Sequence, residues 1–186
     1  KRQVKRPLNN PPRDRRIEPA EETALLNRLG YVEAEVPVTL HQELAMAFLI
    51  ALETAMRQGE ILGITAKAVN LKQRFVHLPL TKNGSSRNVP LSKRAVGLIG
   101  ILLGEKKGAE KLFRLTSASA DAMFRKVRDD VAIVGLTFHD TRHEAITRLA
   151  RKVDVLDLAR ITGHKDPRSL MVYYNATASE MALRLD

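Results

Sequence analysis

The sequence predicts an α+β fold that is mainly α-helical, with a small antiparallel sheet of three strands on one side. Three observations predict it. Apolar residues recur at helical spacing along most of the chain. One stretch, residues 67–92, departs from that spacing and carries three short apolar runs, with the turn signal Asn83-Gly84 between the last two. The length of 186 residues and the hydrophobic content of 44% allow one substantial core, so we expect a single compact domain.

The first half of the chain predicts two helices. One is predicted over residues 18–30, because Pro19 suits a first helical turn and Gly30 suits the residue after the last turn. The second is predicted over residues 39–56, whose middle is apolar on nearly every face, which is typical of a helix buried in the centre of a domain. The end of this central helix should deliver Arg57 from the core.

The spacing of apolar residues also predicts the strands and the later helices. The three predicted strands are marked by their apolar residues: Val69 and Leu71; Phe75, Val76, Leu78 and Leu80; Val89 and Leu91. Helical spacing returns over residues 92–103 and 117–134, with a short connection at residues 111–115. The first of these helices could be taken for one that lies on a membrane surface, but its shortness and its place between a strand and a loop favour a core helix.

Composition limits the classes of function. The absence of cysteine excludes disulfides, thiolate chemistry and cysteine-based metal sites, and it favours a reducing, intracellular setting. The net charge of +10 favours a polyanionic partner, with nucleic acid as the leading class, although charge alone also suits an unrelated basic protein. No stretch resembles a membrane span or a secretory signal. We therefore expect a cytoplasmic protein that associates with DNA and not with membranes.

Polar residues cluster in four short stretches where the surrounding pattern would call for packing. The stretches are "ETAMRQGE", "LTKNGSSR", "FHDTRHEAITRLA" and "ITGHKD", and the adjacent tyrosines Tyr173 and Tyr174 follow them. In this order, from about Arg15 to the C-terminus, they resemble the catalytic domain of the tyrosine recombinases, the phage integrase family. Each stretch alone is a weak signal, whereas all of them in the right order are a strong one.

The resemblance implies catalytic roles for six residues: the first arginine Arg57, the mobile hairpin lysine Lys82, the His139 and Arg142 of a His-x-x-Arg box, the later histidine His164 and the nucleophile Tyr173. The sequence departs from the family pattern at Ala55, where many members have glycine, and at Thr162, where leucine is common. Neither change removes a chemical group, so we expect these departures to affect only helix packing.

The chemistry of phosphodiester cleavage explains why such side chains are needed. The pentavalent transition state carries added negative charge on oxygens that guanidiniums such as Arg57 and Arg142 can grip at two points each. A tyrosine hydroxyl has a pKa of about 10 and needs a base, for which His139 is the candidate. Lys82 is the candidate general acid for the departing 5′ oxygen, and His164 would donate a hydrogen bond to the phosphate. A 3′-phosphotyrosine bond conserves the energy of the cleaved linkage, so we expect no cofactor and no metal.

Only one of the adjacent tyrosines can face a phosphate, because neighbouring helical positions point about 100° apart. A short helix is predicted after Asp166. On it Tyr174 lies on an apolar stripe four residues after Leu170, whereas Tyr173 lies four residues after Ser169. We therefore expect Tyr174 to pack and Tyr173 to stand clear of the packing, which is also the choice that the resemblance implies.

Each candidate residue also has a purely structural interpretation. Arg57 alone is more often an ion-pair partner, here of Glu60 or Glu53, and Lys82 alone is more often an exposed turn residue. His164 follows a glycine and could cap a helix end. His139 and the histidine four residues later could form a zinc pair, but the sequence offers no obvious third ligand.

The resemblance implies site-specific cleavage and rejoining of double-stranded DNA, with the full-length protein assembled as a tetramer on DNA. Two alternatives remain open, a type IB topoisomerase that relaxes DNA by the same chemistry and a non-catalytic DNA-binding module. We expect residues 1–16 to be a basic, proline-containing linker from a missing N-terminal DNA-binding domain, and residues 17–186 to be the catalytic domain. Residues 175–186 have helical spacing and could dock on a neighbouring protomer or on their own domain.

Overall fold

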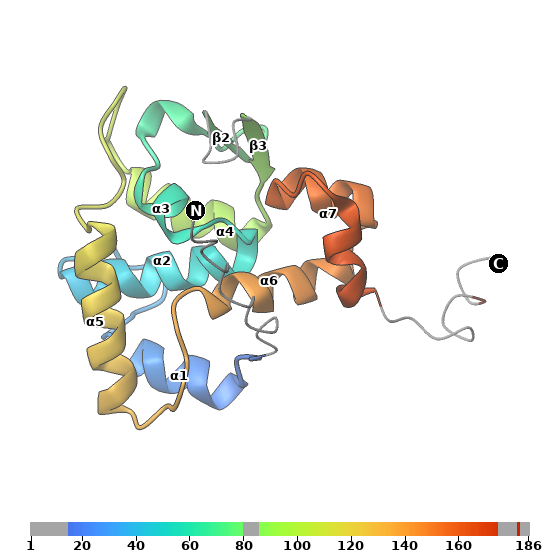
Figure 1. Ribbon diagram of the computed structural model, residues 1–186. Coiled ribbons are helices and arrows are strands. Elements are labelled where there is room, and N and C mark those ends of the chain that lie inside the picture. The colour runs from blue at the N-terminus through green and yellow to red at the C-terminus, as the bar shows by residue number, and fades with distance from the viewer. Residues whose placement is uncertain (1–14, 80–85, 175–181, 183–186) are drawn as a thin grey trace, which may run out of the picture.

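Helices surround one central helix, and a small sheet covers one side of this assembly (Figure 1). The computed structural model describes residues 15–79, 86–174 and 182. The elements in chain order are α1 (Pro19–Arg28), α2 (Leu40–Thr54), α3 (Gln58–Leu62), the 3₁₀ helix η1 (Ala66–Ala68), β1 (Val69–Asn70), β2 (Phe75–Leu78), β3 (Arg87–Pro90), α4 (Lys93–Leu103), α5 (Ser117–Asp130), α6 (Asp140–Ala150), α7 (Val155–Thr162) and the 3₁₀ helix η2 (Pro167–Tyr173). The expected α+β, mainly helical class is confirmed.

Helix α2 is the centre of the core. Thr39 caps it, since its hydroxyl accepts a hydrogen bond from the Gln42 backbone at 3.2 Å. Every residue from Leu44 to Leu52 is at most 2% exposed, as the apolar run predicts. The Phe48 ring stacks on that of Phe124 in α5, with ring centroids 6.1 Å apart. Because α2 is covered on all sides, the chain that leaves its C-terminal end starts from a fixed position.

The sheet confirms the three strands expected from the sequence. They are antiparallel in the order β1-β2-β3, and the register pairs Val69 with Val76 and Val76 with Val89. Val76 and Val89 are fully buried, so one face of the sheet rests on the core. The predicted Asn83-Gly84 turn lies outside the described residues. Helix α4 also buries one face in the core, and no helix in the described ranges is long and apolar enough to cross a membrane.

A second, smaller apolar cluster joins the last elements to the main body. Its buried members are Ala55, Ala145, Ile146, Leu158, Ala159 and Leu170. They come from the end of α2 and from α6, α7 and η2, so the cluster holds the two C-terminal helical elements against α6. Tyr173 and Tyr174 pack against this cluster.

The chain that leads into α1 is tied to α6. The guanidinium of Arg16 forms an ion pair with Glu144, with Nε and Oε2 2.6 Å apart, and Arg148 approaches the same carboxylate at 2.8 Å. Burial alone would raise the pKa of Glu144, but hydrogen bonds from the two arginines outweigh it and lower this pKa to about 2. The predicted boundary at residue 16 therefore lies where the chain already contacts the domain.

Candidate active site

The turn between α2 and α3 positions Arg57. Ala55 ends α2 in the left-handed region, with φ at 53°, and the chain then turns into α3 with Arg57 as its N-cap residue. The Arg57 backbone N–H donates to Glu60 Oε2 at 2.8 Å, and its guanidinium donates to Oε1 of the same carboxylate at 3.2 Å. The ion pair with Glu60 that the sequence suggested is therefore present. The Arg57 side chain is still 31% exposed, so it can also meet a ligand.

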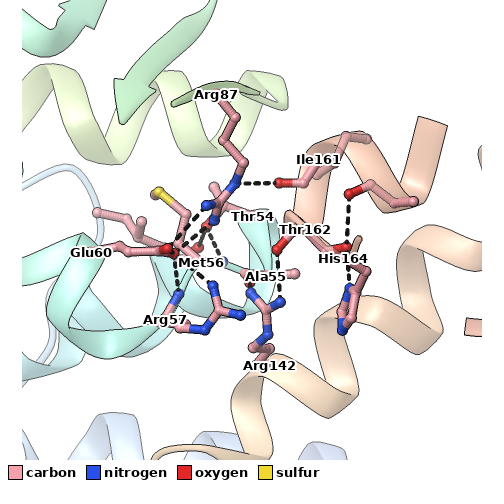
Figure 2. A network of polar contacts seen from close by, with 12 residues as sticks. Thr54, Ala55, Met56, Arg57, Glu60, Arg87, Arg142, Ile161, Thr162 and His164 are labelled. Carbon is pink, nitrogen blue, oxygen red and sulfur yellow. Dashed lines mark hydrogen bonds and ion pairs between the residues drawn. The ribbon is translucent and has the colours of Figure 1, made fainter. Parts of the chain in front are cut away.

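Arg142 joins the ends of two helices from a buried position (Figure 2). Its side chain donates from Nη1 to the carbonyl of Ala55 and from Nη2 to the carbonyl of Thr162, the latter at 2.8 Å. A guanidinium carries five N–H donors, so further donors remain for an anion. Burial and then the Arg57 cation lower the pKa of Arg142 to about 10, while Glu60 and Tyr173 act in the opposite direction. Arg142 is therefore still a cation at neutral pH, and Tyr173 lies within its electrostatic range.

Three of the six candidate residues line one cavity of about 220 Å³: Arg57, His139 and Arg142. His139 is the N-cap residue of α6, and the Arg142 backbone N–H donates to its carbonyl at 3.0 Å. The three-residue spacing of the His-x-x-Arg box thus brings both side chains to the same hollow, where Arg57 reaches them from α3. Two guanidiniums and one imidazole around a small cavity suit the binding of an oxyanion such as a phosphate. Each guanidinium can donate two hydrogen bonds to its oxygens.

His164 follows the glycine that ends α7. Its backbone N–H donates to the Ala159 carbonyl at 3.0 Å. His164 therefore caps the C-terminal end of α7, as its place after a glycine suggested. Its ring nitrogen Nδ1 lies 2.6 Å from the Thr162 hydroxyl oxygen. Burial, followed by the cations Arg142, Arg57 and Arg87, lowers the pKa of His164 to about 4. The ring is therefore neutral at pH 7, and it borders a second cavity of about 380 Å³ beside Arg87.

Arg87 is a site residue that the sequence analysis missed. Its guanidinium makes two hydrogen bonds to the Glu60 carboxylate, at 3.0 and 2.7 Å, and its Nε donates to the Ile161 carbonyl at 3.0 Å. Figure 2 shows how it joins β3, α3 and the end of α7. The strand period could have revealed it, because Arg87 lies two residues before the buried Val89 and so faces the same side of the sheet.

The two tyrosines correct one expectation from the sequence. They lie at the end of η2, a 3₁₀ helix with about three residues per turn, so Tyr173 lies above the buried Leu170. Tyr174 packs as expected, and its hydroxyl donates to the Val153 carbonyl at 2.9 Å. Tyr173 does not stand clear of the packing, because it also contacts this cluster and its ring centroid lies 5.2 Å from that of His143.

Two predictions fall on parts of the chain that the structure does not describe. Lys82 and most of the C-terminal segment, residues 175–186, lie outside the described residues.

The sequence also raised the possibility of a zinc pair. No group of three or more histidine, cysteine, aspartate or glutamate side chains in the described ranges is arranged to hold a metal ion. The His139 and His143 pair therefore has no third ligand of these types there.

Comparisons with known proteins identify the family of this chain. The sequence matches the phage integrase family over residues 15–180. It is 41% identical over 184 residues to an integrase/recombinase homologue of Haemophilus influenzae, a match that covers 98% of this chain and 60% of the relative. The chain thus spans less than two thirds of that protein.

Two solved structures have the same fold. The Tn1549 transposon integrase in complex with transposon right end DNA superposes with a TM-score of 0.71 at 19% identity, over 96% of this chain and 67% of that one. The catalytic domain of bacteriophage HP1 integrase superposes with a TM-score of 0.67 at 21% identity, over 91% of this chain and 92% of that one. The described residues therefore share the fold of these two integrase structures.

Proposed function

Because this chain belongs to the phage integrase family, we propose that it forms the catalytic part of a site-specific DNA recombinase that cleaves and rejoins strands through a 3′-phosphotyrosine intermediate. The observation that carries this proposal is the shared cavity of Arg57, His139 and Arg142, with Tyr173 in electrostatic range of Arg142. A cavity lined by two cations suits the extra negative charge that a phosphodiester gains in its transition state.

The proposed step uses the chain's own side chains. The Tyr173 hydroxyl oxygen attacks the phosphorus, and His139 accepts the hydroxyl proton. The bond from phosphorus to the 5′ oxygen breaks, and Lys82 gives its proton to that oxygen as it leaves. Arg57 and Arg142 hold the non-bridging oxygens, and His164 donates a further hydrogen bond to them. Rejoining is the reverse sequence with the 5′ hydroxyl of another strand.

The substrate in this proposal is double-stranded DNA in the cytoplasm, and the full-length protein acts on it as a tetramer. The net charge of +10 supports DNA as the partner. The similarity to an integrase in complex with DNA, which covers nearly all of this chain, agrees with that partner. Recombination between paired sites, rather than relaxation of a single supercoiled circle, is the activity that separates this proposal from a type IB topoisomerase.

Covalent trapping tests the proposal. The full-length protein is incubated with duplex DNA from the genomic region that flanks its gene, nicked so that a cleaved strand cannot be rejoined, and adducts are separated on a denaturing gel. We expect an adduct with the wild type and with Tyr174→Phe, and none with Tyr173→Phe. An adduct formed by Tyr173→Phe would reject Tyr173 as the nucleophile, and no adduct with any protein on any flanking segment would reject the catalytic proposal.

A further inference from the structure

The ring of His143 packs against the ring of Tyr173. The two ring centroids lie 5.2 Å apart and the ring planes meet at 57°, which is a tilted aromatic contact. His143 lies in α6, whereas Tyr173 is the last residue of η2. The Nδ1 atom of the imidazole is buried, so this ring belongs to the packing between α6 and η2.

Helix α6 presents two neighbouring side chains to two different places. Successive residues of an α-helix point about 100° apart. Arg142 lines the cavity that it shares with Arg57, and His143 meets the ring of Tyr173. Both side chains start from the same turn of one helix, so the contact with His143 sets the place of the Tyr173 ring relative to Arg142.

The other contacts near Tyr173 hold its backbone and one face of its ring. Tyr174, the next residue, is anchored through its hydroxyl, which donates to the Val153 carbonyl at 2.9 Å. Leu170 lies three residues before Tyr173 in a helix of about three residues per turn, so it lies beneath the ring in the second cluster. A tyrosine ring can still turn about its side-chain torsions. The tilted contact with His143 limits this rotation.

The direction of this ring matters because Tyr173 is the proposed nucleophile. A misplacement of about 1 Å in a reacting group can slow a reaction by about 10²-fold. We propose that His143 is a positioning residue for strand cleavage: its ring orients the ring of Tyr173 and so aims the phenol oxygen that forms the covalent bond. The imidazole of His143 takes no part in the proton transfers of the proposed step.

The proposal rests on the proposed function for the role of Tyr173, but the orientation of the Tyr173 ring is a property of this chain alone. It also gives a role to a histidine that the sequence suggested only as half of a zinc pair.

Three variants separate the ring of His143 from other effects of changing a histidine. His143→Phe keeps a flat ring of similar size, and His143→Ala removes the ring. The matched control is His41→Ala, which removes a histidine from the first turn of α2, at the opposite end of that helix from Ala55.

Nuclear Overhauser effects in the full-length protein without DNA report the orientation of the Tyr173 ring. Histidine, tyrosine and leucine are labelled with ¹³C, and the ring signals are identified by their loss in Tyr173→Phe and His143→Ala. We expect the wild type to show contacts between the two rings. Contacts from the Tyr173 ring to the Leu170 methyl groups should persist in His143→Phe and His41→Ala and weaken in His143→Ala.

Single-turnover cleavage of the nicked DNA gives the second readout. We expect His143→Ala to cleave roughly tenfold more slowly with an unchanged affinity for DNA, and His143→Phe to remain within about threefold of the wild type. Urea denaturation checks that each variant is folded under the assay conditions. His143→Leu, which fills the space without a ring, replaces His143→Ala if that variant does not fold.

Four outcomes overturn the proposal: no contact between the two rings in the wild type, a His143→Ala protein with the wild-type Tyr173 ring or the wild-type rate, faster cleavage by that variant, or equal losses in His143→Phe and His143→Ala. The ring measurement decides the orienting role of His143 even if no protein cleaves DNA, and in that case the proposed function alone fails.

Discussion

Arg87 of β3 and Glu60 of α3 meet through two parallel hydrogen bonds, at 3.0 and 2.7 Å, with side chains only 8% and 14% exposed. Glu60 also accepts from the backbone and the guanidinium of Arg57. Burial raises the pKa of Glu60, but the hydrogen bonds and charges of the two arginines outweigh this effect and leave the pKa lowered. One carboxylate thus fixes an arginine that lines the cavity and another that holds the sheet to α7.

Removing the Arg87 side of this pair should strongly destabilise the domain. Arg87→Gln leaves a largely buried carboxylate without its two-point partner, so we expect the free energy of unfolding to fall by about 3 kcal/mol. Urea denaturation followed by circular dichroism measures it. The matched control is Arg160→Gln, because the pair of Arg160 with Asp157 is exposed, at 80% and 53%, and should contribute no more than about 0.5 kcal/mol. Similar losses in the two variants would contradict the structural role of Arg87.

The elements that the sequence predicted correctly are those with long and consistent patterns. Helix α2 was predictable because its middle is apolar on all sides, and the sheet was predictable because three apolar runs flank turn residues. The 3₁₀ helix η2 was not, since seven residues are too few to separate a period of about 3.0 from one of about 3.6. In an α-helix Tyr173 would lie about 60° around the axis from Leu170, whereas in the 3₁₀ helix it lies directly above this buried residue.

The site shows the same division. The motif residues were predictable because their order along the chain resembles a known family, but the contacts between the motifs were not. Arg87 donates to Glu60, which lies 27 residues earlier in the sequence. The Thr162 hydroxyl oxygen lies 2.6 Å from Nδ1 of His164. No pattern in a single sequence encodes such contacts. In the sequence Thr162 therefore showed only a packing difference.

Ala55 carries backbone strain that glycine would relieve. Its φ of 53° lies in the left-handed region, where a Cβ atom costs about 1–2 kcal/mol. Glycine also loses more conformational freedom on folding, and the change removes the buried Ala55 methyl group from the second cluster, so these two costs offset most of the gain. We expect Ala55→Gly to change the free energy of unfolding by less than about 0.5 kcal/mol.

Thermal and urea denaturation check the Ala55→Gly prediction. The matched control is Ala47→Gly in the middle of α2, where the backbone is helical and glycine should destabilise by about 1 kcal/mol. Equal losses of stability in both variants would show that the turn at Ala55 tolerates its Cβ atom without cost. DNA cleavage should persist in Ala55→Gly, because the carbonyl that accepts from Arg142 remains.

Tyr174 should contribute to stability and not to cleavage. Its hydroxyl donates to the Val153 carbonyl at 2.9 Å, so Tyr174→Phe should lower the free energy of unfolding by about 1 kcal/mol. The covalent adduct should still form, in contrast to Tyr173→Phe. Denaturation and adduct formation are measured on the same preparation. A Tyr174→Phe protein that is fully stable but forms no adduct would reverse the roles of the two tyrosines.

Stability should depend on pH through His164. Its pKa falls from an ordinary value of 6.5 to about 4 in the folded chain, mainly because of burial and then because of the neighbouring Arg142 cation. The unfolded chain therefore binds this proton more tightly, so the free energy of unfolding should fall as the pH drops from about 6.5 to about 4. Above that window the ring is neutral in both the folded and the unfolded chain, so it does not change the free energy of unfolding with pH.

Urea denaturation at about pH 7.5, 5.5 and 4.5 compares the wild type with His164→Gln, which lacks the titrating group. The wild type should lose more stability than the variant across these conditions, and parallel losses in both proteins would show that His164 does not carry the effect.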